Sequence, residues 1–148
     1  MRVLPFSKLN LPKLEKLAKK INPEGFTALS PNGLTYLDID DNYIHTLYPL
    51  LPFKNISKPK YFNDNAIGAH ISVIYPEENR IILAHDLNQA HHFEVTGIYT
   101  ALHNAKRYFV VGVSSPSLLA LRTGYQLPEK PVFKNLGVDF HITIAVRF

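Results

Sequence analysis

Two short stretches, HISVI at residues 70–74 and HITIA at residues 141–145, follow one pattern. Each begins with a histidine, places a hydroxyl residue two positions later and continues with aliphatic residues. Because β-branched residues favour extended backbone, both stretches are predicted to be strands. The two histidines lie 71 residues apart, close to half of the 148-residue chain. A duplicated lobe would produce this spacing.

Side chains alternate between the two faces of a strand. His70 and Ser72 are therefore expected on one face of the first strand, with Ile74, and His141 and Thr143 on one face of the second, with Ala145. The intervening aliphatic residues would anchor the opposite faces in a core. Each strand thus presents an imidazole beside a hydroxyl group.

This arrangement suits the cleavage of a phosphodiester without a metal ion. The reaction needs a base for the attacking oxygen, an acid for the leaving oxygen and donors for the nonbridging oxygens. Histidine can serve as either acid or base because its ordinary pKa is about 6.5, and hydroxyl groups can donate to the phosphate oxygens. The alternative interpretation is that His70 and His141 are structural residues, since the three-residue pattern is short.

The segments HIS at 70–72 and HIT at 141–143 resemble the two signature motifs of the 2H phosphoesterase superfamily, which includes the LigT-like RNA 2′-5′ ligases and cyclic phosphodiesterases. Tyr75 resembles the aromatic residue that follows the first motif. The sequence departs from the family pattern at Ser72, where threonine is more usual. It departs again at residues 76–78, where PEE replaces a frequent glycine.

The resemblance implies a bilobal α+β fold, with two pseudo-symmetric antiparallel-sheet lobes, helices outside and a central cleft. It implies that His70 and His141 form the acid–base pair and that Ser72 and Thr143 donate to phosphate oxygens. It also implies catalysis without a metal or other cofactor. The substrate would be an RNA end, a 2′-5′ linked oligonucleotide or a small cyclic nucleotide.

The remainder of the chain predicts an α+β fold with mainly antiparallel sheet, because strands outnumber helices and hairpins join them. We expect one domain over residues 1–148, since no linker or low-complexity segment divides the chain. The predicted helices cover residues 11–21, 42–51 and 116–123, the last with Ser115 as its N-cap. The predicted strands cover residues 34–40, 69–75 paired with 80–85, 93–102 paired with 106–113, and 138–147, with loops at 52–68 and 127–137.

The composition is that of a folded protein, with 46% hydrophobic and 19% charged residues. A net charge of +4 favours an anionic partner. The absence of cysteine excludes disulfides and zinc sites with cysteine ligands. No apolar run has the length of a signal peptide or a membrane span, so we expect a cytoplasmic monomer that does not bind a membrane.

Aromatic residues that could stack on a nucleobase are Tyr61, Phe62, Tyr75 and Tyr125. Of these, Tyr75 and Tyr125 are the candidates for substrate binding, because Tyr75 follows the first motif and Tyr125 precedes the loop before the last strand. Ordinary packing is the alternative for each. Lysines at positions 54, 58 and 60 could form a phosphate-attracting rim or a solvated loop face.

The segment HDLNQAHH places His85, His91 and His92 close together, but no carboxylate and histidine spacing of a metal site accompanies them. We therefore predict no metal site. His103 lies outside this cluster, and no neighbouring residues suggest a catalytic or metal-binding role for it. The sequence favours a metal-independent phosphodiesterase. The alternatives are a basic RNA-binding module of the same fold without turnover, and a metal-dependent hydrolase that uses the three clustered histidines.

Overall fold

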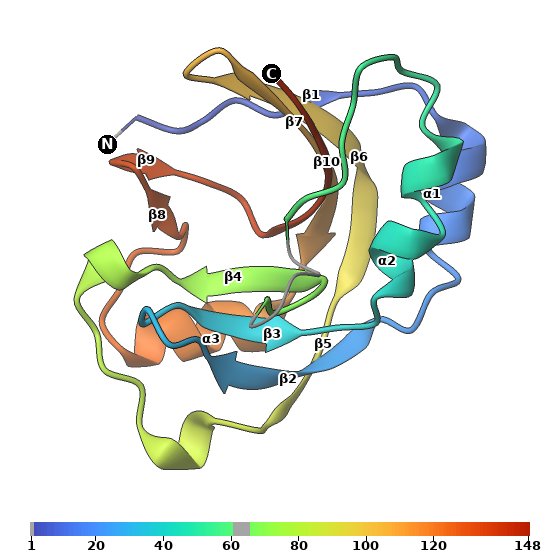
Figure 1. Cartoon of the computed structure of the whole chain (residues 1–148). Coiled ribbons are helices and arrows are strands. Elements are labelled where there is room, and N and C mark those ends of the chain that lie inside the picture. Colours follow the sequence, from blue (N-terminus) through green and yellow to red (C-terminus); the bar gives the residue numbers. More distant parts are fainter. Residues whose placement is uncertain (1, 61–65) are drawn as a thin grey trace.

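Two four-stranded antiparallel sheets form the frame of the protein, and each carries a histidine strand at one edge (Figure 1). The computed structural model describes residues 2–60 and 66–148. The first sheet has the order β4-β3-β2-β5; its strands are β2 (Glu24–Leu29), β3 (Thr35–Asp38), β4 (His70–Ile74) and β5 (Ala90–His92). The second has the order β10-β7-β6-β1; its strands are β1 (Ser7–Lys8), β6 (Glu94–His103), β7 (Lys106–Ser114) and β10 (His141–Arg147).

The two sheets are built in the same way. In each sheet, a hairpin is followed by a segment that lies outside that sheet. The histidine strand then pairs with the second strand of the hairpin. The hairpins are β2–β3 and β6–β7, and β5 and β1 complete the sheets at equivalent edges. This repeated order confirms the predicted bilobal α+β fold with antiparallel sheets.

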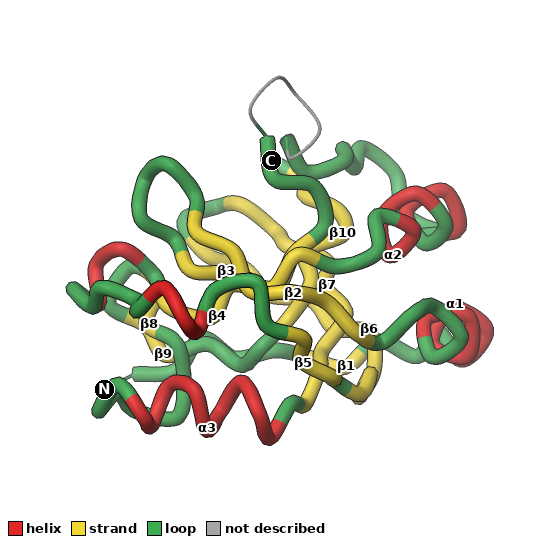
Figure 2. The backbone as a smooth tube through the Cα atoms, turned by 90° about the horizontal axis from the view of Figure 1, so that it is seen from below, coloured by secondary structure: helices red, strands yellow, loops and turns green. Residues whose placement is uncertain are grey.

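The helices lie outside the sheets, and each covers the sheet of the other half of the chain (Figure 2). Helices α1 (Pro12–Ala18) and α2 (Asn42–His45) contact β6 and β10. Helix α3 (Pro116–Gly124) contacts β4 and β5 instead. The two lobes therefore interlock, because each lobe buries its sheet against a helix from the other.

Local sequence signals explain two of these helices. The buried residues of α1 are Leu14 and Ala18, which lie four positions apart on one helical face. At the start of α3 the Ser115 hydroxyl accepts a hydrogen bond from the Leu118 amide. Both predicted helices are confirmed, although α1 is shorter than expected and α3 extends through Gly124. Among the described residues, no helix is long and apolar enough to cross a membrane.

The structure corrects the predicted partner of the first histidine strand. Strand β4 pairs with β3, and residues 80–83 form no strand. They are followed by the short 3₁₀ helix η3 (Ala84–Asp86). Ile81 is 90% exposed and Leu83 is also exposed, whereas Ile82 is buried without being part of a strand. The preceding turn is the 3₁₀ helix η2 (Pro76–Glu78), which directs the chain away from β4.

Other segments differ from their predictions as well. Strands β1, β2 and β5 were not predicted. Strands β1 and β5 have only two and three residues, and each pairs with a strand distant in sequence. In β2 the apolar residues do not mark the buried face, because Phe26 and Leu29 are exposed and Thr27 is buried. The predicted loop at 127–137 contains a small hairpin of β8 (Val132–Phe133) and β9 (Leu136–Gly137). The predicted helix at 42–51 divides into α2 and the 3₁₀ helix η1 (Tyr48–Leu50) near Pro49, and the last strand begins at His141.

Candidate active site

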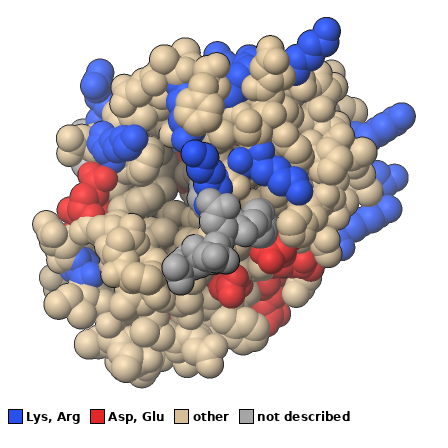
Figure 3. Space-filling model, in the orientation of Figure 1, with Lys and Arg blue, Asp and Glu red and all other residues tan. Residues whose placement is uncertain are grey.

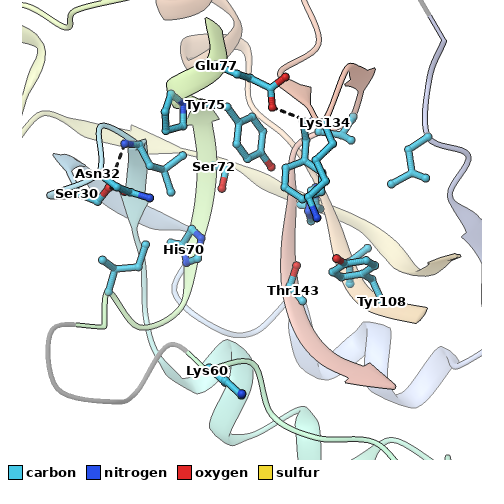
Figure 4. Close-up of a pocket in the computed structure, with 18 of the residues that line it drawn as sticks. Ser30, Asn32, Lys60, His70, Ser72, Tyr75, Glu77, Tyr108, Lys134 and Thr143 are labelled. Carbon is cyan, nitrogen blue, oxygen red and sulfur yellow. Dashed lines mark hydrogen bonds between the residues drawn. The ribbon is translucent and has the colours of Figure 1, made fainter. Parts of the chain in front are cut away.

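The histidine strands of the two lobes line one cavity of about 720 Å³ between the sheets. His70 and Ser72 come from β4 and Thr143 comes from β10 (Figure 4). His141 is the first residue of β10 and lines the same cavity. In the space-filling view the surface is hollowed here, with Lys and Arg side chains at its margin (Figure 3). The structure thus brings together all four residues that the motifs singled out, and the volume lies in the range of small-molecule sites.

The two imidazoles are held in the same way. The Nδ1 atom of His70 lies 3.0 Å from the carbonyl oxygen of Gly68, two residues earlier in the chain. The Nδ1 atom of His141 lies 2.7 Å from the carbonyl oxygen of Asp139, also two residues earlier. A carbonyl only accepts, so in each neutral ring Nδ1 carries the proton. Nε2 is then the nitrogen that can take a proton from a substrate.

An aromatic ring supports each imidazole. Tyr36 of β3 packs edge-on against His70, with ring centroids 5.7 Å apart and an angle of 77°. Phe6 packs against His141 with centroids 5.2 Å apart and an angle of 88°. Edge-to-face contacts of this kind favour one ring orientation. These two residues were not predicted, because nothing in the local sequence indicates which ring faces which histidine.

Burial governs the protonation of both histidines. It lowers the pKa of His70, against a smaller opposing effect of the Gly68 carbonyl, and the charge of His141 lowers that pKa further. Burial also lowers the pKa of His141, while the carbonyl and the charge of Asp139 oppose it. A positive charge on one imidazole disfavours protonation of the other. The site therefore favours states in which at most one of the two histidines is protonated at Nε2.

Both histidine strands contain a bulge directly after the hydroxyl residue. In β4, Ser72 and Ile74 pair with adjacent residues of β3, and in β10, Thr143 and Ala145 pair with adjacent residues of β7. One extra residue in each strand therefore reverses the alternation of faces. Ile74 is 1% exposed and Ala145 is fully buried in the core, which corrects the prediction that they share the histidine faces.

The hydroxyl groups lie at the end of each polar face. Thr143 is 8% exposed and Ser72 is half-buried, and both line the cavity. Within the part of the chain that the structure describes, neither hydroxyl forms a hydrogen bond with another residue. Both hydroxyls can therefore donate to a phosphate oxygen without first breaking an internal bond.

The PEE segment shapes the upper wall of the cavity. The Glu78 carboxylate accepts a hydrogen bond from the Tyr75 amide at 2.9 Å and pairs with the buried Arg122 of α3. The Glu77 carboxylate accepts hydrogen bonds from the backbone amides of Lys134 and Asn135 in the β8–β9 turn, at 2.7 and 3.2 Å. This segment therefore ties the first histidine strand to the hairpin opposite it.

Of the two predicted stacking residues, Tyr75 lines the cavity and Tyr125 does not. The Tyr75 ring lies 5.3 Å from the Phe133 ring of β8, measured between centroids. The Tyr125 hydroxyl instead donates to Asp86 at 2.5 Å and accepts from the Leu83 amide at 2.8 Å. Tyr125 thus anchors the segment around η3, a role that its position before the last strand did not indicate.

Of the three lysines that could form a phosphate-attracting rim, one lies at the cavity. Lys60 lines the cavity, whereas Lys54 and Lys58 do not, and the Lys58 ammonium lies over the Tyr48 ring. Tyr61 and Phe62 lie outside the described residues.

The clustered histidines do not form a metal site in the described parts of the chain. No group of three histidine, aspartate or glutamate side chains there is arranged to hold a metal ion. His91 instead contacts the Ser117 hydroxyl at 2.8 Å through Nδ1, and His85 lies 3.5 Å from an oxygen of Asp86.

The cavity also contains residues that the sequence did not suggest. They come from the N-terminal segment, the β2–β3 turn, η2, β7 and the β8–β9 hairpin, and Lys134 and Glu77 are the charged members. A polar turn sequence such as SPNG at residues 30–33 indicates a turn but not its position beside a cavity. The residues concerned are Leu4, Phe6, Ser30, Asn32, Glu77, Tyr108, Phe133 and Lys134.

A two-lobed fold with one histidine and one hydroxyl residue from each lobe in a shared cavity defines a 2H-type domain. The chain matches the family model described as Swiss Army Knife, 2H phosphoesterase domain, over residues 35–147. The protein therefore belongs to the 2H phosphoesterase family, whose members are generally phosphodiesterases. No curated protein and no solved structure is detectably similar to the chain.

Proposed function

We propose that the protein is a metal-independent phosphodiesterase that acts on 2′,3′-cyclic phosphates or 2′-5′ linked nucleotides by two-histidine acid–base catalysis. The observation that carries this proposal is the equivalent placement of His70 and His141. Both side chains line one cavity, and a backbone carbonyl binds Nδ1 of each. In each ring, Nε2 is therefore the atom that takes up or gives a proton.

For a 2′,3′-cyclic phosphate, Nε2 of one neutral histidine takes a proton from water as the water oxygen bonds to phosphorus. The bond from phosphorus to one ribose oxygen breaks, and the protonated Nε2 of the other histidine gives that oxygen its proton. The product is a ribose phosphate monoester. For a 2′-5′ linkage the neighbouring 3′-hydroxyl attacks instead, and the 5′-oxygen of the next nucleotide leaves with the proton. Both reactions need one neutral and one protonated imidazole.

Ser72 and Thr143 are proposed to donate hydrogen bonds to the nonbridging phosphate oxygens, where negative charge must be stabilised. We expect Ser72→Ala and Thr143→Val each to lower kcat/KM by about 5- to 150-fold, corresponding to a hydrogen bond of ~1–3 kcal/mol to a charged oxygen. Steady-state kinetics of the two variants measure this loss. Unchanged kinetics in both variants would remove the hydroxyls from the mechanism.

The pH dependence of kcat/KM follows from the protonation of the two histidines. Because burial lowers the pKa of both from 6.5, we expect a bell-shaped profile with its maximum below pH 6.5. Activity falls at low pH as the base gains a proton and at high pH as the acid loses one. An anionic substrate stabilises imidazolium, so the kcat profile should lie at higher pH than the kcat/KM profile. A kcat/KM maximum above pH 7.5 would contradict the assignment.

The proposed reaction is tested with three substrates in the presence of EDTA: a 2′,3′-cyclic nucleotide, a 2′-5′ linked oligoadenylate and an RNA ending in a cyclic phosphate. We expect the wild type to cleave at least one of them and His141→Ala to lose that activity. Loss of wild-type activity in EDTA would instead favour a metal-dependent hydrolase. Binding without turnover on any substrate would favour the RNA-binding module.

A further inference from the structure

A second hollow, of about 450 Å³, lies next to the catalytic cavity at the β8–β9 hairpin. The two spaces share Leu4 and Lys134 in their linings. Lys134 therefore stands at the junction between them. A ligand that extends from the histidines past the hairpin would enter this hollow.

The second hollow has a cationic lining. Arg2, His103 and Lys134 contribute basic side chains, and Asn104 and Asn135 contribute amides. None of the described residues that line it is an aspartate or a glutamate. Glu77 lies close by, on the side of the catalytic cavity, but both of its carboxylate oxygens accept hydrogen bonds from turn amides. The chemistry of this lining suits an anion such as a phosphate group.

The backbone holds these cations in place. The carbonyl of Arg2 accepts a hydrogen bond from the Gly137 amide of β9 at 2.9 Å, which ties the N-terminal segment to the hairpin. Lys134 and Asn135 have φ angles of 49° and 65°, as in the tight two-residue turns that join antiparallel strands. Because the backbone that carries these side chains is already ordered, less entropy is lost when they bind an anion.

Phe133 separates the second hollow from the catalytic cavity. Its ring contacts the Tyr75 ring in the cavity and the His103 ring in the hollow, with centroid distances of 5.3 and 6.2 Å. The Lys134 ammonium lies over the same ring at 5.1 Å. A nucleoside beside Tyr75 and Phe133 would therefore have the histidines at one end and the cationic lining at the other.

We propose that the second hollow binds the phosphate on the 5′ side of the nucleotide whose 3′ end reacts at the histidines. The substrate is then an oligonucleotide strand, which carries one such phosphate per nucleotide, in preference to a mononucleotide. This proposal rests on the proposed phosphodiesterase function. It adds Arg2, His103 and Lys134 as residues that select for the extra phosphate.

Binding of two ligands that differ by one phosphate tests the proposal independently of turnover. We would measure Kd by calorimetry for adenosine 3′-monophosphate and adenosine 3′,5′-bisphosphate. The variants are wild type, Arg2→Gln, His103→Gln and Lys134→Gln, with Lys20→Gln as a control that removes an exposed lysine outside both cavities. We expect the wild type and Lys20→Gln to bind the bisphosphate at least about tenfold more tightly than the monophosphate, with a steeper dependence on salt.

The ratio of the two dissociation constants should fall to about threefold or less in Arg2→Gln and Lys134→Gln, and His103→Gln should reduce it as well. Equal affinity of the wild type for both ligands, or a ratio that no subsite variant changes, would overturn the proposal. Failure of either ligand to bind would overturn it as well. Turnover of a cyclic nucleotide without any preference for the bisphosphate would leave the phosphodiesterase function intact and reject only the second hollow.

Discussion

His70→Ala and His141→Ala are each expected to lower kcat by about 10²- to 10⁴-fold, the range for loss of a general acid or base. The double variant should lose little more than either single variant, because the two groups act in one transition state and their effects are not additive. Both imidazoles line the same cavity, and in each a backbone carbonyl two residues earlier binds Nδ1. Steady-state kinetics of the three variants on the cleaved substrate measure the effect.

A matched control separates catalysis from folding. His91→Ala removes a histidine that contacts Ser117 outside the cavity, so it should retain activity within about twofold of the wild type. Circular dichroism and thermal unfolding should show that the His70 and His141 variants remain folded. Nearly full activity in either single variant would refute the two-histidine mechanism, and a large loss in His91→Ala would revive the metal-dependent alternative.

The second large effect concerns stability and involves Arg122. This side chain is fully buried and Glu78 is 3% exposed. Its guanidinium donates to both carboxylate oxygens of Glu78, at 2.9 and 2.7 Å. It also donates to three backbone carbonyls, at 2.8 to 2.9 Å, which are those of Val73, Pro128 and Lys130. Arg122 therefore joins α3, the first histidine strand and the chain that leads to β8.

We expect Arg122→Ala to lower the free energy of unfolding by ~3–5 kcal/mol, because it leaves a buried carboxylate and several carbonyls without their donor. Urea denaturation measures the change. Arg80→Ala is the matched control, since Arg80 is exposed and donates only to carbonyls, and its loss should stay below about 1 kcal/mol. A loss below about 1 kcal/mol for Arg122→Ala as well would show that the buried ion pair does not organise the fold.

The central residues of the site were predictable because the signal is local. A strand with period two places His70 beside Ser72, and His141 beside Thr143, whatever the rest of the fold does. The similarity of the two histidine strands also indicated two lobes. The same alternation predicted that Ile74 and Ala145 would share these faces, and it was wrong there because a bulge follows each hydroxyl residue. A bulge depends on the partner strand, so the pattern of one strand does not reveal it.

The surroundings of the histidines were not predictable, because contacts between distant residues create them. Phe6 supports His141 from 135 positions away, and Phe133 meets Tyr75 across the cavity. Lys134 lines the cavity, and Glu77 accepts a hydrogen bond from its backbone amide. Phe6, Phe133 and Lys134 do not stand out in composition or spacing.

The sequence by itself determined the α+β class, the helix at α3, the hairpin β6–β7 and the four residues that carry the proposed chemistry. Each follows from the preferences of neighbouring residues, which act over a few positions. Only the tertiary structure decided that β4 pairs with β3, that the helices cover the opposite lobe and that Tyr125 lies outside the cavity. These outcomes depend on which surfaces bury one another. That selection is made by the free energy of the whole packed chain, and no single segment encodes it.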